Sequence, residues 1–399
     1  MRSAAEEANE RLVVQLIARG ALWSRPLIAA FRATPRHRFL ERIYHYARRD
    51  GGWREVAAHP PGRAELRLLY SDRALTTRLS EPGPGRPQVP ISSSSQPSLM
   101  AQMLEDLRLA PGQRVLEVGA GTGYNAALTA HVTGGVVSVE VDRRVLAEAE
   151  GHLLAFPDRE VTFRHADGRE GWPAAAPYDR VIVTAATPDL EPAWLGQLAE
   201  GGVLLAPLEL ATGLSYLVRG GATDGVFEGR LTRPAYFMPL RAEGETGRDG
   251  SGEAGLPPPE GLEAAPAPWA PWAERRPPVI GPSFLQSLAF LAWLEGLAVS
   301  YATLPDGRPS YGMCDRVRGH GCWLGAREWR VTGASGQELG RRLWRTFLDL
   351  GGPWPTEFRL RAYPPGQGPD TPPGRGAFLR QGLRCTQVWE LIEPRERGG

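Results

Sequence analysis

The sequence predicts an α/β fold, doubly wound around a mostly parallel sheet, followed by a smaller C-terminal α+β domain. Short apolar stretches over 114–118, 135–140, 161–165 and 180–184 alternate with helical periodicity over 124–131, 145–154 and 192–199. Strands that are apolar on both faces and separated by helices are typical of a parallel sheet with both faces covered. The length of 399 residues adds the expectation of two or three domains, at roughly 100–200 residues each.

The flanking segments are interpreted from their periodicity and composition. Apolar residues recur at helical spacing over 4–33, which predicts two helices separated near Gly20. The Gly-, Pro- and Arg-rich stretch 50–64 and the Pro- and Gly-rich stretch 80–90 predict loops. A strand over 202–207 and an antiparallel hairpin of 213–219 with 226–233 are expected to follow the parallel strands.

Composition divides the chain into three parts. We expect a main domain over 1–242, a Pro/Gly/Ala-rich linker over 243–282 and an accessory domain over 283–399. The accessory domain regains periodicity, with helices expected over 284–294 and 339–348 and strands over 357–363 and 386–392. The tryptophans of this part are expected to be core residues.

Charge and cysteine content exclude several classes of protein. All 46 basic residues are arginine, and they nearly balance 45 acidic residues. The absence of lysine excludes a Schiff-base enzyme, a Walker-type phosphate loop and a lysine general base. The near-zero net charge disfavours a nucleic-acid partner. Three cysteines without paired spacing favour a reducing cytoplasm, and neither a secretory signal nor a membrane span is expected.

The glycine-rich turn after the first apolar strand is the most informative segment. Gly119, Gly121 and Gly123 separate the strand from the next helix. Glycines allow a ligand to approach the backbone, and the helix N-terminus offers free N–H groups to it. A dinucleotide fingerprint would require glycine at 124, where the chain has Tyr124. The pattern instead resembles the S-adenosylmethionine (SAM) site of Rossmann-like methyltransferases.

Acidic residues follow the next two strands. Glu140 ends the second strand, where its two oxygens can bind ribose hydroxyls, and Asp167-Gly168 follows the third, where a carboxylate can accept from an adenine amino group. A solvated carboxylate at 140 and a simple turn at 167 are the alternatives. The predicted cofactor-binding residues are Glu117, Gly119, Gly121, Gly123, Tyr124, Asn125, Glu140, Asp167 and Gly168.

Residues 8–242 resemble the protein-L-isoaspartate O-methyltransferases almost from end to end. The matching pieces are Gln15–Gly20, Thr34–Phe39, Tyr70–Leu75, Ser95–Pro97, Val115–Asn125, Asp167-Gly168, Tyr178–Ala185, Gln197–Gly202 and Tyr236–Leu240. The resemblance implies a Rossmann-like catalytic domain that uses SAM and no metal. It implies transfer of a methyl group to the carboxylate of an L-isoaspartyl or aspartyl residue in a polypeptide partner, giving an ester that can collapse to a succinimide.

The resemblance also implies a substrate site at the serine-rich segment before the glycine turn. Ser95 matches the family serine beside the substrate carboxyl, which makes it the predicted catalytic residue, although a polar loop or a helix cap would use the same residue. The predicted substrate-binding residues are Asp72, Ser94, Gln96 and Pro97. For Asp72, capping of the loop is an equal alternative. His37 is expected to be structural.

The sequence departs from the family pattern in two places. Ser92-Ser-Ser-Ser95 replaces the usual segment, and residues 283–399 extend beyond ordinary members. Both features resemble the branch that modifies ribosomally made peptides, so the alternative activity is a dedicated aspartate methyltransferase that forms an aspartimide.

The sequence also bears on classes outside this enzyme family. A binding protein with a degenerate methyltransferase fold and a nucleic-acid methyltransferase are both less favoured. A metal site at Cys314, His320 and Cys322 is disfavoured by their spacing.

Overall fold

The computed structural model describes residues 3–47, 51–58, 60–83, 87–243, 245, 262–270, 282–304, 307, 309–325, 328–374 and 376–392. The chain divides into two compact units. The first comprises Met1–Ala186, Ala193–Ala206 and Phe237–Asp249, and the second comprises Thr187–Pro192, Pro207–Tyr236 and Gly250–Gly399. This division separates residues 207–236 from the rest of the predicted main domain at 1–242.

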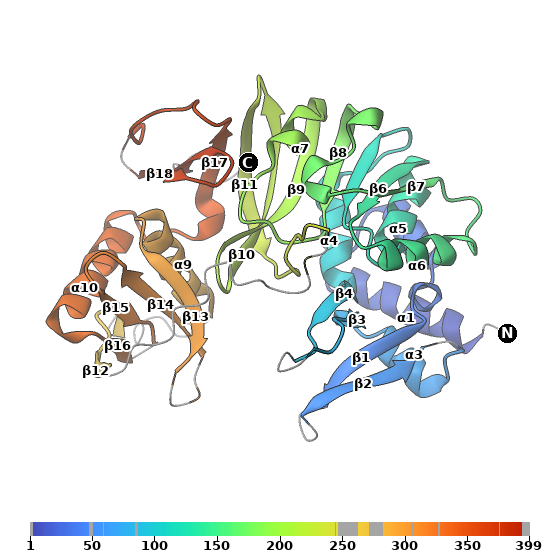
Figure 1. Ribbon diagram of the computed structural model, residues 1–399, viewed down its shortest axis with the longest axis horizontal. Coiled ribbons are helices and arrows are strands. Elements are labelled where there is room, and N and C mark those ends of the chain that lie inside the picture. The colour runs from blue at the N-terminus through green and yellow to red at the C-terminus, as the bar shows by residue number, and fades with distance from the viewer. Residues whose placement is uncertain are drawn as a thin grey trace. The chain divides into compact units, whose positions relative to one another are not determined.

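The first unit is built on parallel strands in the order β9-β8-β5-β6-β7. Their bounds are β5 Val115–Val118, β6 Val136–Glu140, β7 Val161–His165, β8 Tyr178–Val183 and β9 Leu198–Ala211. Figure 1 shows α5 (Tyr124–Thr133) and α6 (Arg143–Leu153) alongside β6 and β7. The predicted doubly wound sheet is confirmed. Its strand order reverses beside β5, where such sheets bind ligands at the carboxyl ends of their strands.

The N-terminal part of the first unit adds helices and a small antiparallel sheet, in the order β2-β1-β3-β4. Its elements are α1 Ala4–Ala18, α2 Arg25–Ala33, η1 Arg36–Phe39, β1 Arg42–Ala47, β2 Gly52–Ala57, α3 Arg63–Leu69, β3 Leu75–Leu79, β4 Pro90–Ser94 and α4 Pro97–Leu107. The two helices predicted within 4–33 are confirmed, and α1 buries Leu12, Val13 and Leu16 at helical spacing.

Two local predictions in the first unit are wrong. The expected loop over 50–64 contains β2, because β1 supplies a partner strand whose hydrogen bonds override the Gly and Arg content. The helix expected over 192–199 ends early, since α7 spans Pro192–Gly196 and Leu198 already pairs with Tyr178 of β8. The expected loop over 80–90 ends where β4 begins at Pro90, and its residues 84–86 lie outside the described part.

In the described part of the second unit there are two antiparallel sheets and two long helices. One sheet includes the strands β18-β19-β17-β11-β10 and the other has the order β12-β16-β15-β14-β13. The elements are β10 Leu214–Thr223, β11 Val226–Pro234, β12 Glu263–Pro266, α9 Pro282–Leu294, β13 Ala298–Thr303, β14 Pro309–Asp315, β15 His320–Trp323, β16 Glu328–Val331, α10 Gly333–Asp349, η4 Pro355–Glu357, β17 Phe358–Tyr363, β18 Ala377–Gln381 and β19 Thr386–Leu391. The predicted hairpin is β10 with β11, and both predicted helices are present.

Aromatic side chains form a core of the second unit around Trp269. Trp323, Trp329 and Trp344 are buried as expected, whereas Trp354, also expected in the core, is 38% exposed. The ring of Trp269 contacts Phe284, Trp329 and Trp344 at centroid distances of 6.3, 5.4 and 6.1 Å. Its indole N–H donates to the Gly325 carbonyl at 2.9 Å. Trp269 and β12 fall within the expected linker over 243–282, so residues 262–270 of that linker are ordered core and edge strand. Residues 246–261 and 271–281 of that linker lie outside the described residues.

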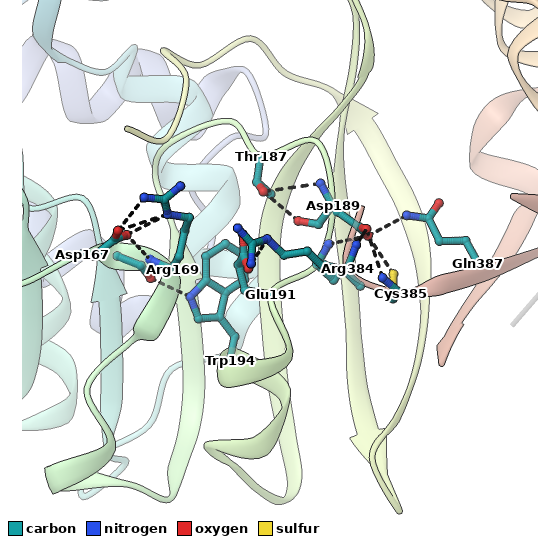
Figure 2. A network of polar contacts seen from close by, with 11 residues as sticks. Asp167, Arg169, Thr187, Asp189, Glu191, Trp194, Arg384, Cys385 and Gln387 are labelled. Atoms are coloured by element: carbon teal, nitrogen blue, oxygen red, sulfur yellow. Dashed lines mark hydrogen bonds and ion pairs between the residues drawn. The ribbon is translucent and has the colours of Figure 1, made fainter. Parts of the chain in front are cut away.

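A buried carboxylate ties residues 187–192 to the β18–β19 hairpin within the second unit (Figure 2). Asp189 Oδ2 accepts from the backbone N–H groups of Arg384 and Cys385 at 2.7 and 3.2 Å. Asp189 Oδ1 accepts from the Cys385 thiol and from the Gln387 amide at 2.7 and 2.8 Å. Beside it, Glu191 forms an ion pair with Arg384 at 2.8 Å. Every oxygen of the buried Asp189 carboxylate is therefore hydrogen-bonded.

Two expected absences concern the part of the chain that the structure describes. There, no helix combines the length and the apolar character that crossing a bilayer requires. No group of three or more metal-ligating side chains is found among the same residues. His320 begins β15, and Cys322 lies buried in that strand.

Candidate functional site: a glycine turn beside a serine-rich strand

The glycine turn lies at the carboxyl end of β5 and opens α5. Gly119, Gly121 and Gly123 have φ values of 95°, 53° and 79°, in the left-handed region that favours glycine. A Cβ at Gly119 would lie 2.6 Å from the Thr184 hydroxyl. At Gly121 a Cβ would meet only the Ser93 carbonyl, at 3.6 Å. The backbone at Gly121 is therefore the open part of the turn, where a ligand can approach it.

Glu140 closes one side of this open turn. Its Oε2 accepts from the Gly121 N–H at 3.1 Å, and its Oε1 accepts from the N–H groups of Val141 and Asp142 at 3.0 and 3.1 Å. Burial raises the pKa of the Glu140 carboxyl, while these backbone donors oppose the shift. A carboxylate beside an open glycine backbone offers the acceptor oxygens that the hydroxyls of a ribose diol require, so the residues fit SAM.

Asp167 and Gly168 follow β7 at the same edge of the sheet. Asp167 accepts from its neighbour Arg169, with Oδ2 2.6 Å from Nη2 (Figure 2). The Gly168 carbonyl accepts from the Trp194 indole at 2.8 Å. A Cβ at Gly168 would lie 2.6 Å from Val118, which explains the glycine by packing against β5. The Asp167 side chain is about one third exposed, at 31%, and can reach a ligand.

Three of the predicted cofactor contacts point into the protein. Glu117 Oε1 accepts from the Asn125 amide at 2.6 Å, and its Oε2 accepts from the Ser138 hydroxyl at 2.5 Å. The ring of Tyr124 packs against Phe39, with the centroids 5.3 Å apart. Both Glu117 oxygens are thus occupied within the fold. A direct contact of Glu117, Tyr124 or Asn125 with SAM stays a prediction.

The serine-rich segment lies directly against the glycine turn. The Ser93 carbonyl is the neighbour of Gly121 described above. Ser94 is buried, and its hydroxyl accepts from Arg36 Nε at 3.2 Å. The Ser95 hydroxyl, by contrast, forms no hydrogen bond with any described residue. The Ser93 hydroxyl likewise forms no hydrogen bond with a described residue, so Ser93 and Ser95 are both available to a ligand beside the turn, and the match to the family serine favours Ser95.

The remaining predicted substrate residues organise the start of α4. Gln96 caps the helix with its backbone, and Pro97 is its first residue. Asp72 Oδ1 accepts from the Ser98 N–H at 2.9 Å, while its Oδ2 pairs with Arg19 at 2.6 Å. Both oxygens of Asp72 have protein partners, which favours its alternative role as a cap.

Sequence reasoning missed two arginines at this site. Arg36 is completely buried and contacts the serine-rich segment, and the matching piece Thr34–Phe39 was its only signal. Arg241 donates from Nη2 to the Ile91 carbonyl at 2.8 Å, and its charge lowers the pKa of the Glu140 carboxyl, against the larger effect of burial. His37 is structural as expected, with Nδ1 2.6 Å from the Tyr70 hydroxyl.

Comparisons with known proteins agree with this arrangement. Residues 73–245 match the family model "Protein-L-isoaspartate(D-aspartate) O-methyltransferase (PCMT)". Protein-L-isoaspartate O-methyltransferase 1 of Anaeromyxobacter sp. (strain Fw109-5) is 43% identical over 148 residues, which are 37% of this chain and 70% of the relative. The Chromohalobacter salexigens protein-L-isoaspartate O-methyltransferase is 36% identical over 205 residues, 51% of this chain and 87% of the relative.

A solved structure extends the likeness in fold to the C-terminal part. A protein-L-isoaspartate O-methyltransferase structure aligns with a TM-score of 0.51 and 23% identity, covering 88% of this chain and 96% of its own. This coverage exceeds residues 1–245, so the alignment reaches beyond the family model. The C-terminal extension therefore does not by itself set this chain apart. With most of the length of two relatives matched at 36% and 43% identity, the chain belongs to the protein-L-isoaspartate O-methyltransferase family.

Proposed function

We propose that this protein is a SAM-dependent carboxyl O-methyltransferase that acts on L-isoaspartyl residues of polypeptides. The observation that carries the proposal is the contact between the serine-rich segment and the glycine turn. The Ser93 carbonyl lies 3.6 Å from the position of a Cβ on Gly121. A carboxylate oriented by the serine-rich segment would therefore adjoin a methyl donor held at the glycine turn.

Some residues of the site would hold the methyl donor, and others would orient the carboxylate that accepts the methyl group. Bound SAM supplies a methyl group on a sulfonium, which a carboxylate oxygen can displace in line. Glu140 would accept from the ribose hydroxyls and Asp167 from the adenine amino group, beside the backbone of Gly121. The Ser95 hydroxyl would donate to the substrate carboxylate, with Gln96 and Pro97 fixing the backbone next to it.

No general base is required for this reaction. A carboxylate with an ordinary pKa of about 3.9 is ionised near neutral pH. Positioning of the two reactants can contribute about 7–11 kcal/mol when the reacting atoms are well aligned. This agrees with a site that offers hydroxyl and backbone donors to the acceptor. A polypeptide partner and a cytoplasmic location belong to the same proposal, the latter supported by the sparse, unpaired cysteines.

The test is methyl transfer from labelled SAM to two linear peptides that differ only in an isoaspartyl or a normal aspartyl linkage. We expect transfer to the isoaspartyl peptide. Ser95→Ala should lower kcat/KM by about 10- to 100-fold, because one charge-assisted hydrogen bond is lost. Ser92→Ala is the matched control, since the Ser92 hydroxyl accepts from Thr77 within the small sheet, and its activity should be unchanged.

Inactivity on both peptides with intact SAM binding would contradict the isoaspartyl substrate. That result would favour the alternative substrate, an aspartate in a dedicated, cyclised peptide. Failure to bind SAM would instead contradict the enzyme assignment itself.

A further inference from the structure

Arg36 is a fully buried cation at the centre of the serine-rich segment. It begins η1, and the neighbouring Phe39 anchors that turn by stacking on Phe156, with the ring centroids 5.1 Å apart. Burial lowers the pKa of Arg36 to about 10, which leaves its guanidinium charged near neutral pH. Burying a charge without compensating partners costs free energy of desolvation, so the groups that contact Arg36 indicate what it does.

Oxygen atoms surround the guanidinium on every side. Its acceptors are the carbonyls of Leu69, Ser71, Arg73, Ser94 and Ser95 and the hydroxyl of Ser94, at distances of 2.9–3.2 Å. These contacts use all three guanidinium nitrogens. Asp72, the acidic residue whose charge acts on Arg36, is itself paired with Arg19. Among the described residues the charge of Arg36 is thus met by neutral oxygens, with no carboxylate bonded to it.

The contacts with Ser94 and Ser95 set the shape of the substrate segment. Successive carbonyls of an extended strand point to opposite sides. Here the Ser94 and Ser95 carbonyls both reach Arg36 Nη2, at 3.2 and 2.9 Å. The chain must therefore turn at the end of β4. With its carbonyl drawn toward Arg36, Ser95 is held in one conformation while its hydroxyl keeps no partner among the described residues.

We propose that Arg36 is a positioning residue for the substrate carboxylate. It fixes the Ser94–Ser95 backbone through a fork of hydrogen bonds, and its charge, to which no carboxylate is hydrogen-bonded, makes this segment favour an anionic side group over a neutral one. Arg36 acts through the serine-rich segment and does not touch the substrate. This inference rests on the proposed function for the identity of the acceptor, a carboxylate on an isoaspartyl residue.

Two substitutions separate the effect of the Arg36 hydrogen bonds from the effect of its positive charge. Arg36→Lys keeps the charge but cannot bridge as many carbonyls, whereas Arg36→Met removes both. Arg32→Met is the matched control, because Arg32 pairs with Glu10 at the surface and contacts no part of the serine-rich segment.

The first measurement is amide hydrogen exchange over residues 92–98 in the protein alone. We expect exchange there to rise about tenfold or more in Arg36→Lys and Arg36→Met, and not in Arg32→Met. Unchanged exchange in a folded Arg36→Lys protein would overturn the positioning role. Because no substrate is involved, this result is independent of the proposed function. Ser94→Ala is the second variant in case Arg36→Met fails to fold. It removes a single acceptor of Arg36 and should also raise amide exchange over residues 92–98.

The second measurement compares two peptides on the protein saturated with S-adenosylhomocysteine. One carries the isoaspartyl carboxylate and its twin carries the corresponding carboxamide. We expect wild type and Arg36→Lys to prefer the carboxylate by about tenfold and Arg36→Met to lose the preference. With SAM, Arg36→Lys should lower kcat on the order of 100-fold, because the acceptor is misplaced, with a smaller change in KM.

The outcomes of the second measurement separate the two proposals. An undiminished preference for the carboxylate in Arg36→Met would overturn the electrostatic part. Wild type that binds neither peptide would contradict the isoaspartyl substrate, while the exchange experiment would still decide whether Arg36 holds the segment.

Discussion

The Glu117 carboxyl is a buried acid whose partners are both uncharged. Desolvation raises its pKa to about 7, against the hydrogen bonds from Ser138 and Asn125, which lower it. The carboxyl joins β5 to β6 and to α5 from inside the fold. Its protonation state therefore affects the stability of the scaffold beneath the glycine turn.

The sign of the pH dependence follows from the raised pKa. The ordinary value is 4.5 and the folded value is about 7, so between these pH values the folded protein binds more protons than the unfolded chain. Its contribution lowers the free energy of unfolding as pH rises through this window, by about 3 kcal/mol in total. Glu117→Gln can keep both hydrogen bonds and should remove this loss.

Urea unfolding at pH 4.5 and pH 8 measures the effect. Glu117→Gln should gain up to about 3 kcal/mol over wild type at pH 8 relative to pH 4.5. Glu150→Gln, on the exposed face of α6, serves as the control and should change little at either pH. Parallel pH profiles for wild type and Glu117→Gln would show that the pKa of Glu117 does not differ between the folded and unfolded states.

At the scale of elements, the sequence predicts the glycine turn but not the direction of the side chains around it. Gly119, Gly121 and Gly123 are predicted from their spacing after a strand, and all three have the expected positive φ. All four residues of β5 are buried. In such a strand, period-two alternation cannot tell which side chains face a ligand. The resemblance of the glycine-rich segment to a SAM site makes Glu117 a predicted cofactor contact. Its oxygens bind Asn125 and Ser138, and the contact with SAM stays a prediction.

Long-range contacts limit prediction in the same way. Arg36 contacts Ser94 and Ser95, 58 and 59 residues further along. A motif shows that an arginine is present, but not which carbonyls it will reach. Pairing partners likewise decide the strands β2 and β12, whose local composition indicates a loop and a linker.

Substitution of Gly121 tests the open part of the turn. Gly121→Ala and Gly134→Ala each place a Cβ at a positive φ, 53° and 93°, without a close clash. Each should cost about 1–2 kcal/mol of stability. Because its Cβ enters the space beside Ser93, only Gly121→Ala should weaken SAM binding, by about tenfold or more. Calorimetric titration with SAM checks this, and equal affinities for the two variants would place the donor elsewhere.

At the scale of the whole chain, the order of segments along the sequence does not match the compact units. Residues 187–192 and 207–236 belong to the second unit, although 187–192 lie in sequence between the parallel strands β8 and β9 and 207–211 are the last residues of β9. Periodicity predicted most of these elements, but the pairing of β11 with β17 has no local signal. The composition of the chain and the extent of the family resemblance, residues 8–242, indicate a boundary at 242, which stays a prediction.

Substitution of Asp189 tests how much its hydrogen-bond network stabilises the second unit. Asp189→Asn exchanges an acceptor for a donor amid five surrounding donor groups, the fifth being the Leu190 N–H, so about 2–4 kcal/mol of stability should be lost. Asp224→Asn is the same change at an exposed turn whose φ of 52° suits asparagine. It should stay within about 0.5 kcal/mol of wild type. Chemical denaturation measures both, and an Asp189→Asn protein as stable as wild type would contradict the role of the buried carboxylate.

The Asp189 network also constrains the timing of folding during synthesis. Asp189 and the backbone amides that it binds are separated by 195 and 196 positions. At about 5–20 residues per second, the ribosome needs roughly 10–40 s to make the residues between them. During that interval Asp189 is without its partners, and an ionised carboxylate stays in water. The nascent segment 187–192 therefore stays hydrated until the β18–β19 hairpin has been synthesised. A delay in translation within this interval would expose the incomplete second unit to proteases and chaperones for longer.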